Sequence, residues 1–182
     1  NGSGAYRNRA MLVPTMAVIN HCAELDMCAP IRAKRFPEPK VEKEPATEEW
    51  IEAFMANASP HLGALACFMF ATGARISEAL NVAWRDVDMQ AAKVRIVMGK
   101  LGGETRVAHM PPELIAALAN IPSNREPDVA LFPYAAYDSV RKPWDAVIAR
   151  AGIKAVTPHG CRHGFATGLM HAGVDPITVA KR

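Results

Sequence analysis

Apolar residues at helical spacing begin the chain. Residues 7–27 carry apolar side chains three and four positions apart, which predicts one helix in which Pro14 is either a kink or an early-turn residue. Residues 29–45 follow with four prolines, a surplus of basic residues and no hydrophobic period, so an extended linker is expected there. The pattern therefore predicts a first segment that is separate from the rest of the chain.

From residue 47 onward, the pattern predicts a helical domain. Thr47 can cap a helix whose first turn holds Glu48 and Glu49. Residues 59–73 are nearly all apolar between Ser59-Pro60 and Gly73, which predicts a helix at the centre of the core. Further helices are predicted within residues 74–88, 111–121, 138–153, 157–173 and 175–182.

Residues 93–110 read differently, as strand, glycine turn and strand, and predict an antiparallel hairpin. The expected fold class is mainly α with a small antiparallel β-sheet (α+β). Three segments are expected: residues 1–28 as the last helix of an incomplete module, 29–46 as a basic linker, and 47–182 as a domain whose last helix is cut off by the chain end.

Composition excludes several classes of protein. Half of the 182 residues are apolar, enough for one well-buried core, and the apolar run Ala10–Ile19 is too short to span a membrane. No CxxC pair is present, so a zinc knuckle or a disulfide framework is not expected. We expect a soluble, cytoplasmic protein. The four cysteines are interpreted as packing residues: Cys22, Cys28, Cys67 and Cys161.

Charge is arranged in alternating blocks. The net charges are +3 for residues 1–43, −5 for 44–90, +3 for 91–110, −3 for 111–140 and +5 for 141–182. If the three basic blocks fold onto one face, that face could bind a polyanion such as DNA. Solvated surfaces that average out explain the same pattern.

The stretch TPHGCRHGFATGLMHAG, residues 157–173, gathers three histidines and an arginine. Thr157 suits an N-cap and Pro158 the first helical position. At about 100° per residue, His159, Arg162 and His163 fall away from the apolar face. The residues expected on the buried face are Cys161, Phe165, Gly168, Leu169 and Ala172.

Three interpretations of this helix start were compared. His159 and His163 have the i, i+4 spacing of metal ligands, but Gly160 stands where a zincin needs glutamate and Cys161 points elsewhere, so no metal is expected. A histidine and Arg162 at a helix N-terminus instead suit an oxyanion. A solvated polar face remains the alternative.

Two further cations suggest the same chemistry. Arg75 follows Gly73 among apolar neighbours, where burial without a partner is costly, so an anion is expected beside it. Glu78 could be that anion within the chain. Lys100 at the hairpin tip could close over a ligand, or be an ordinary turn lysine.

These pieces resemble the tyrosine recombinase (phage integrase) family over nearly the whole chain. ATGARISEALNVAWRDVD, residues 71–88, is similar to the first arginine box; MGKLGGETRVAHMP, 98–111, to the hairpin with the catalytic lysine; and residues 157–173 to the H-x-x-R-H box. The three boxes occur in the family's order and spacing. The resemblance implies the tyrosine recombinase catalytic-domain fold and a double-stranded DNA recombination site as partner.

The resemblance also implies roles for individual residues. Arg75 and Arg162 would hold the non-bridging oxygens of the scissile phosphate, and Lys100 would protonate the leaving 5′ oxygen. His159 would assist in acid/base chemistry. The supporting residues would be Glu78, beside the first arginine, and His163, as a hydrogen-bonding buttress.

The tyrosine nucleophile is where the chain departs from the family. The family places it after the H-x-x-R-H box, whereas Tyr6, Tyr134 and Tyr137 all precede that box. Tyr134 and Tyr137 lie in a loop-like segment, where packing or contact with the DNA backbone is expected rather than nucleophilic attack. We therefore expect the 182-residue chain to bind DNA without cleaving it, and the full-length protein to be a recombinase that cleaves through a 3′-phosphotyrosine. Also expected are a homotetramer on DNA, no metal or other cofactor, no small-molecule substrate and no membrane association.

Two other functions were considered. A non-catalytic DNA-binding module or degenerate integrase explains the basic blocks, but not why Arg75, Lys100, His159 and Arg162 occur together. A different phosphotransfer enzyme would need a carboxylate or metal cluster. For that role the motif segments offer only Glu78, Asp86 and Asp88.

Overall fold

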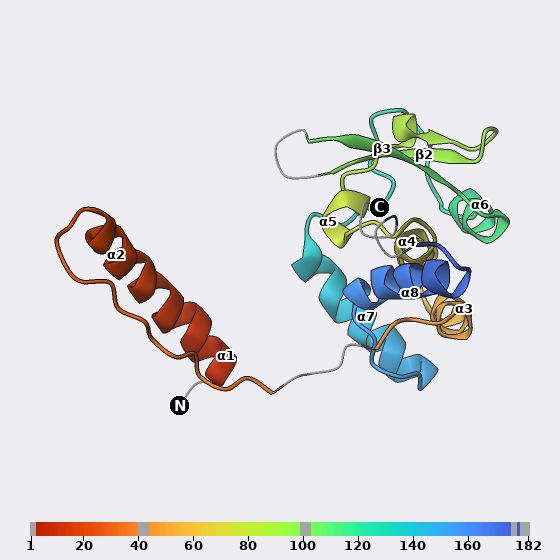
Figure 1. Cartoon of the computed structure of the whole chain (residues 1–182). Coiled ribbons are helices and arrows are strands. Elements are labelled where there is room, and N and C mark those ends of the chain that lie inside the picture. The colour runs from red at the N-terminus through yellow and green to blue at the C-terminus, as the bar shows by residue number, and fades with distance from the viewer. Residues whose placement is uncertain (1–2, 40–43, 99–102, 176–177, 179–182) are drawn as a thin grey trace. The chain divides into compact units, whose positions relative to one another are not determined.

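The computed structural model describes residues 3–39, 44–98, 103–175 and 178. The chain divides into two compact units, residues 1–42 and residues 43–182 (Figure 1). No helix in the described part of the chain is both long and apolar enough to cross a membrane.

The first unit is one helical rod with an extended return segment. Helix α1 (Gly4–Arg7) continues through a π-helical turn (Asn8–Leu12) into α2 (Val13–Glu24), which confirms the predicted helix and places Pro14 in the first turn of α2. Residues 29–39 have no regular secondary structure, as expected for the linker.

Asn8 holds the return segment against the rod. Its side chain is almost fully buried, donates to the carbonyl of Phe36 at 2.9 Å and accepts from the Phe36 amide at 2.8 Å. It also donates to the Glu38 carboxylate at 2.5 Å. One amide side chain thus satisfies three partners on the segment that leaves this unit.

The second unit begins with two helices at the predicted positions. Helix α3 (Glu48–Asn57) starts at Thr47, whose hydroxyl accepts from the Trp50 amide at 3.2 Å. Helix α4 (Pro60–Thr72) ends at Gly73, whose φ of 65° suits a residue without a Cβ. Nine of its residues are buried, so α4 is the centre of the core, as its composition predicted.

The remaining elements surround α4. Helix α5 (Ile76–Ala79) and a 3₁₀ turn (Trp84–Asp86) lead into an antiparallel sheet in the order β1-β2-β3. Strands β2 (Lys93–Val97) and β3 (Thr105–His109) pair Lys93 with His109 and confirm the predicted hairpin, while β1 (Val87–Asp88) was not predicted. The later helices are α6 (Pro112–Ala119), α7 (Tyr137–Ala151) and α8 (Pro158–His171). The helix predicted within 175–182 lies almost wholly outside the described residues.

Aromatic rings join α3 to α7. The rings of Trp50, Phe54 and Trp144 pack with centroids 4.4 to 6.0 Å apart. Both indoles are satisfied, since Trp50 donates to the carbonyl of Lys154 at 2.8 Å and Trp144 to that of Val156 at 2.9 Å. These two bonds fix the segment that leads into α8.

Helix α8 packs through a glycine edge, which corrects the predicted face. Cys161 is buried as expected, but Gly168 and Ala172 are exposed, and the buried positions include Gly160 and Gly164. A Cβ at Gly164 would clash with the carbonyl oxygen of Ala46 and the ring of Phe70. The hydrophobic wheel missed this edge because it weights side-chain apolarity, whereas close helix packing depends on the missing side chain.

The cysteines divide by burial. Cys67 and Cys161 are buried, and burial raises the pKa of both thiols. Cys22 is half-buried and Cys28 is exposed, so the interpretation as a packing residue is wrong for Cys28. Cys28 lies in the bend after α2 ends at Glu24, where its thiol donates to the Ile19 carbonyl at 3.6 Å without being covered.

Replacing Gly164 with alanine should destabilise the second unit by about 1–3 kcal/mol, because the added methyl group meets backbone as well as a ring. The matched control is Gly168→Ala on the same helix, where a Cβ meets nothing within 4 Å. This control should be neutral or stabilising by up to ~1 kcal/mol. Urea unfolding followed by tryptophan fluorescence measures the effect in this unit alone, since all three tryptophans lie in it. Equal midpoints for the two variants would contradict the close packing of α8.

Candidate phosphate-binding site

Arg75 lies at the start of α5, in the turn that follows α4. Its side chain is 55% exposed, so the expectation that this arginine is embedded among apolar neighbours is wrong. The buried member of the pair is Glu78, whose side chain is 5% exposed. The turn after Gly73 directs the guanidinium outward because the short helix α5 buries its other face, including Ala79.

The Glu78 carboxylate fixes Arg75 at two points. One oxygen accepts from the backbone amide of Arg75 at 2.9 Å, and the other accepts from its Nη1 at 2.7 Å. Glu78 is therefore the internal anion that the sequence offered as an alternative partner. Because the carboxylate engages one edge of the guanidinium, it orients the group while leaving it exposed to solvent.

Arg162 reaches the same turn from α8. Its Nη1 donates to the carbonyl oxygen of Gly73, two residues before Arg75. Burial lowers the pKa of Arg162, the positive charge of Arg75 lowers it further, and the charge of Glu78 raises it. Both arginines are thus held at the turn around Gly73, Arg162 by the Gly73 carbonyl and Arg75 two residues further along the chain.

The imidazole of His159 lies in the first turn of α8. Its ring centroid is 4.5 Å from that of His163, and the ring planes cross at 81°. His159 is exposed and His163 is half-buried, so the two rings contact each other one helical turn apart.

Arg75 and His159 line one pocket of about 370 Å³. Tyr137, at the start of α7, also lines it, together with Ser77 and Thr157. The sequence placed Tyr137 in a loop-like segment with packing or DNA-backbone contact as its expected role, but no local pattern brought it to this pocket, at the start of α7. The predicted lysine, Lys100, lies outside the described residues.

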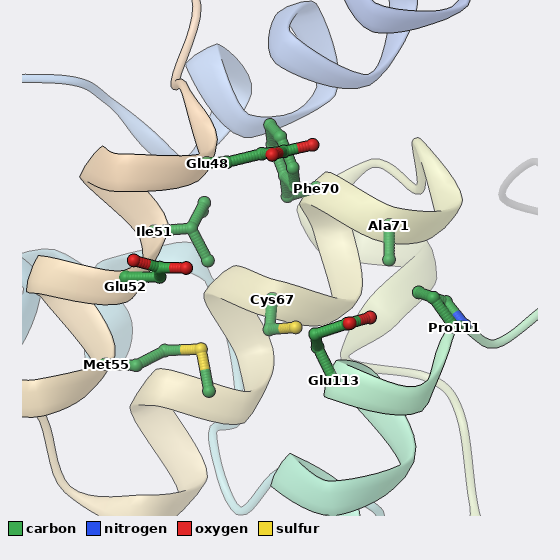
Figure 2. A pocket seen from close by; sticks show the side chains of 9 residues that line it. All are labelled: Glu48, Ile51, Glu52, Met55, Cys67, Phe70, Ala71, Pro111 and Glu113. Carbon is green, nitrogen blue, oxygen red and sulfur yellow. The ribbon is translucent and has the colours of Figure 1, made fainter.

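A second cavity, of about 310 Å³, is lined by residues of α3, α4 and α6 and shares none with the first (Figure 2). Its charged side chains are Glu48, Glu52 and Glu113, which would repel a phosphate. Burial, with a contribution from the charge of Glu113, raises the pKa of its Cys67 thiol to about 11. Across the described ranges, no group of His, Cys, Asp and Glu side chains is arranged to hold a metal ion.

The first pocket therefore combines the groups that bind a tetrahedral oxyanion. Arg75 and His159 line it, Arg162 is held nearby through Gly73, and the first turn of the 14-residue helix α8 adds its positive dipole end. Guanidinium groups bind phosphate oxygens in fixed geometry and keep their charge at neutral pH. The fold and the pocket together define an α+β domain with a cationic pocket that suits an oxyanion.

Comparison with known proteins gives the family. Residues 46–182 match the phage integrase family, and the chain belongs to it. The matched range contains all three motif segments noted in the sequence, residues 71–88, 98–111 and 157–173.

Individual relatives agree. The chain is 35% identical over 120 residues to a putative integrase/recombinase of Sinorhizobium fredii, y4eF, with 60% of this chain and 46% of the relative covered. It is 29% identical over 201 residues to the tyrosine recombinase XerC of Mesorhizobium japonicum, with 98% and 61% covered. The chain thus spans about half to three-fifths of these relatives.

Solved structures share the fold. A crystal structure of XerA recombinase matches with a TM-score of 0.63 and 25% identity, over 90% of this chain and 62% of that one. The Tn1549 transposon integrase in complex with circular intermediate DNA matches with a TM-score of 0.66 and 20% identity, over 91% and 66%. The expected mainly helical catalytic-domain fold with a small antiparallel sheet is confirmed.

Glu78→Gln should destabilise the second unit by about 1–3 kcal/mol, because the new amide turns one of two engaged acceptors into a donor that faces Arg75. Urea unfolding by tryptophan fluorescence tests this, with Glu104→Gln as control because Glu104 is exposed. An unchanged midpoint for Glu78→Gln would show that the carboxylate does not fix the turn.

Proposed function

We propose that the chain carries the strand-transfer site of a site-specific DNA recombinase that cleaves and rejoins DNA through a 3′-phosphotyrosine intermediate. The observation that carries the proposal is the convergence of Arg75 and Arg162, from α5 and α8, beside the pocket that His159 lines. Structures with this fold include a lambda integrase dimer bound to a core site and the Tn1549 integrase with DNA. Membership of the family supports the assignment.

The two arginines would act on the phosphorus centre. When a tyrosine oxygen attacks the scissile phosphate, the O–P bond forms as the bond to the 5′ oxygen breaks, and the equatorial oxygens gain negative charge. The guanidinium groups of Arg75 and Arg162 stabilise the more negative transition state more strongly than they stabilise the ground state. Glu78 and the Gly73 carbonyl hold them in place beforehand, so little reorganisation is needed.

Two protons have to move in this step. His159 lines the pocket and would assist the loss of the phenol proton, with His163 supporting its ring. Lys100 would give a proton to the leaving 5′ oxygen, since neighbouring cations favour the neutral form of a lysine. Neither transfer requires a metal or a nucleotide.

The attacking tyrosine belongs after the α8 motif in this family, whereas the three tyrosines of the 182 residues precede it. The proposal is therefore that this polypeptide binds a double-stranded recombination site without forming a covalent bond. Residues 1–28 and the linker 29–46 would belong to a module that helps the 47–182 domain clamp DNA. A homotetramer on DNA, working in the cytoplasm, completes the proposal.

A non-catalytic DNA-binding module of the same family is the alternative. This alternative predicts the same DNA binding but no strand cleavage, so Arg75 and His159 would have no catalytic role. Carboxylates for a water-attack mechanism are poorly placed, since Glu78 is committed to Arg75 and Asp86 accepts from Arg95 at 2.6 and 2.9 Å.

Arg75→Ala and Arg162→Ala should each lower covalent trapping on a nicked suicide substrate by about 100-fold or more, because each removes charge stabilisation of the transition state. Trapping is measured with the protein as its gene encodes it, as a DNA-linked band on a denaturing gel. Site binding by gel shift should remain, and Arg85→Ala, an exposed arginine paired with Asp128, should trap normally. Undiminished trapping by either site variant would remove the phosphate-binding assignment.

Lys100→Ala should also lower trapping, but a substrate with sulfur at the 5′-bridging position should restore it to within about 10-fold of the wild type. A thiolate leaves without a proton, so the general acid becomes dispensable. Arg75→Ala serves as the control, since its defect should persist on the sulfur substrate. Failure of the rescue would exclude Lys100 as the acid.

A further inference from the structure

Three adjoining hollows meet at Tyr137. The first, of about 370 Å³, contains Arg75 and His159; the second, of about 210 Å³, contains Arg141; and the third, of about 220 Å³, contains Asn81. Tyr137 lines all three, and Ser77 lines the first and third. The three hollows are therefore neighbours, lined by residues of α5, of α7 and of the start of α8, and together they are called the groove.

The side chains of Tyr137 and Arg141 lie one helical turn apart on α7 and border the same hollow. Both residues are exposed. Among the residues that the structure describes, neither side chain has a hydrogen-bond or ion-pair partner. One phenolic hydroxyl and one guanidinium group are thus available to a ligand in the groove.

Charge limits what can lie there. Arg75 and His159 occupy the central hollow, and the groove's carboxylate within the described ranges is Asp145, beyond Arg141 on α7. An anion is therefore favoured on the Tyr137 side of Arg141. Tyrosine hydroxyls and arginines are common ligands of DNA backbone phosphates, and phosphates follow one another along a strand.

We propose that Tyr137 and Arg141 bind the DNA phosphate next to the one held at Arg75, His159 and Arg162. This inference rests on the proposed function, because it takes the central hollow to hold the scissile phosphate. Tyr137 and Arg141 are positioning residues: they touch a neighbouring phosphate and fix the strand so that the correct phosphorus atom faces the two site arginines.

The test maps individual phosphates. A DNA sequence that the protein binds is selected from a random duplex library, and its phosphates are ethylated at random, so that each phosphate needed for binding is found by interference. The phosphate at which ethylation interferes with binding of the wild type but not of Arg75→Ala is the central phosphate. Tyr137→Phe and Arg141→Gln should each lose interference at one phosphate adjacent to it on the same strand, and keep the central one.

Affinity gives a second readout. Tyr137→Phe and Arg141→Gln should each weaken binding about five-fold. Only Arg141→Gln should lower the slope of log K against log salt, by about 0.9, because only it removes a charge. The matched control is Lys142→Gln, the adjacent exposed cation of α7, which lines none of the three hollows and should change neither readout.

The outcomes separate the two proposals. Suppose that Arg75→Ala loses interference at one phosphate. If Tyr137→Phe and Arg141→Gln then lose interference at no phosphate, or at that same phosphate, the inference is overturned while the proposed function stands. If Arg75→Ala alters no phosphate, or the protein selects no DNA, both are overturned. Because Tyr137 and Arg141 are exposed, neither substitution should disturb the fold. Thermal unfolding of each variant checks this.

Discussion

The close packing of α8 on the centre of the domain is the constraint on which the site depends. Gly160 and Gly164 let α8 approach the backbone of residues 44–46, and the Gly160 carbonyl accepts from the Ala46 amide at 3.0 Å. Helix α8 lies beside α4 as a result (Figure 1). Only at this distance can Arg162 reach the carbonyl of Gly73, where α4 ends. A larger residue in the glycine edge would move the cation, the imidazole and the helix dipole together.

The cations of the site are held by oxygens of the fold itself. A buried carboxylate engages Arg75, and a turn carbonyl engages Arg162. Each acceptor occupies part of a guanidinium fork and leaves its remaining N–H groups to a ligand. Such fixed donors stabilise developing charge without reorganising, which is the property that phosphoryl transfer requires. The same arrangement gives His159 a defined partner ring and places it in the pocket with Arg75.

Local signals in the sequence predicted most elements, because caps and turn glycines act over a few residues. Thr47 begins α3 and Gly73 ends α4 where expected, and the glycine-rich segment between two apolar runs predicted the hairpin. Three-dimensional packing explains what was missed. The two-residue strand β1 has too few residues for a period, and the exposure of Arg75 depends on which face α5 buries. Tyr137 reaches the site only because α5, α7 and α8 meet there, a long-range contact that no local pattern reports.

The guanidinium groups of Arg75 and Arg162 are held at one turn of the chain, and the charge of Glu78 offsets part of the repulsion that Arg75 exerts on Arg162. Any anion that fits between them binds the native state and not the unfolded chain, so mass action couples its concentration to the folding equilibrium. The melting temperature of this domain is consequently a joint property of polypeptide and buffer. Phosphate or sulfate bound at the two arginines would act on the melting temperature as a ligand does, beyond its contribution to ionic strength.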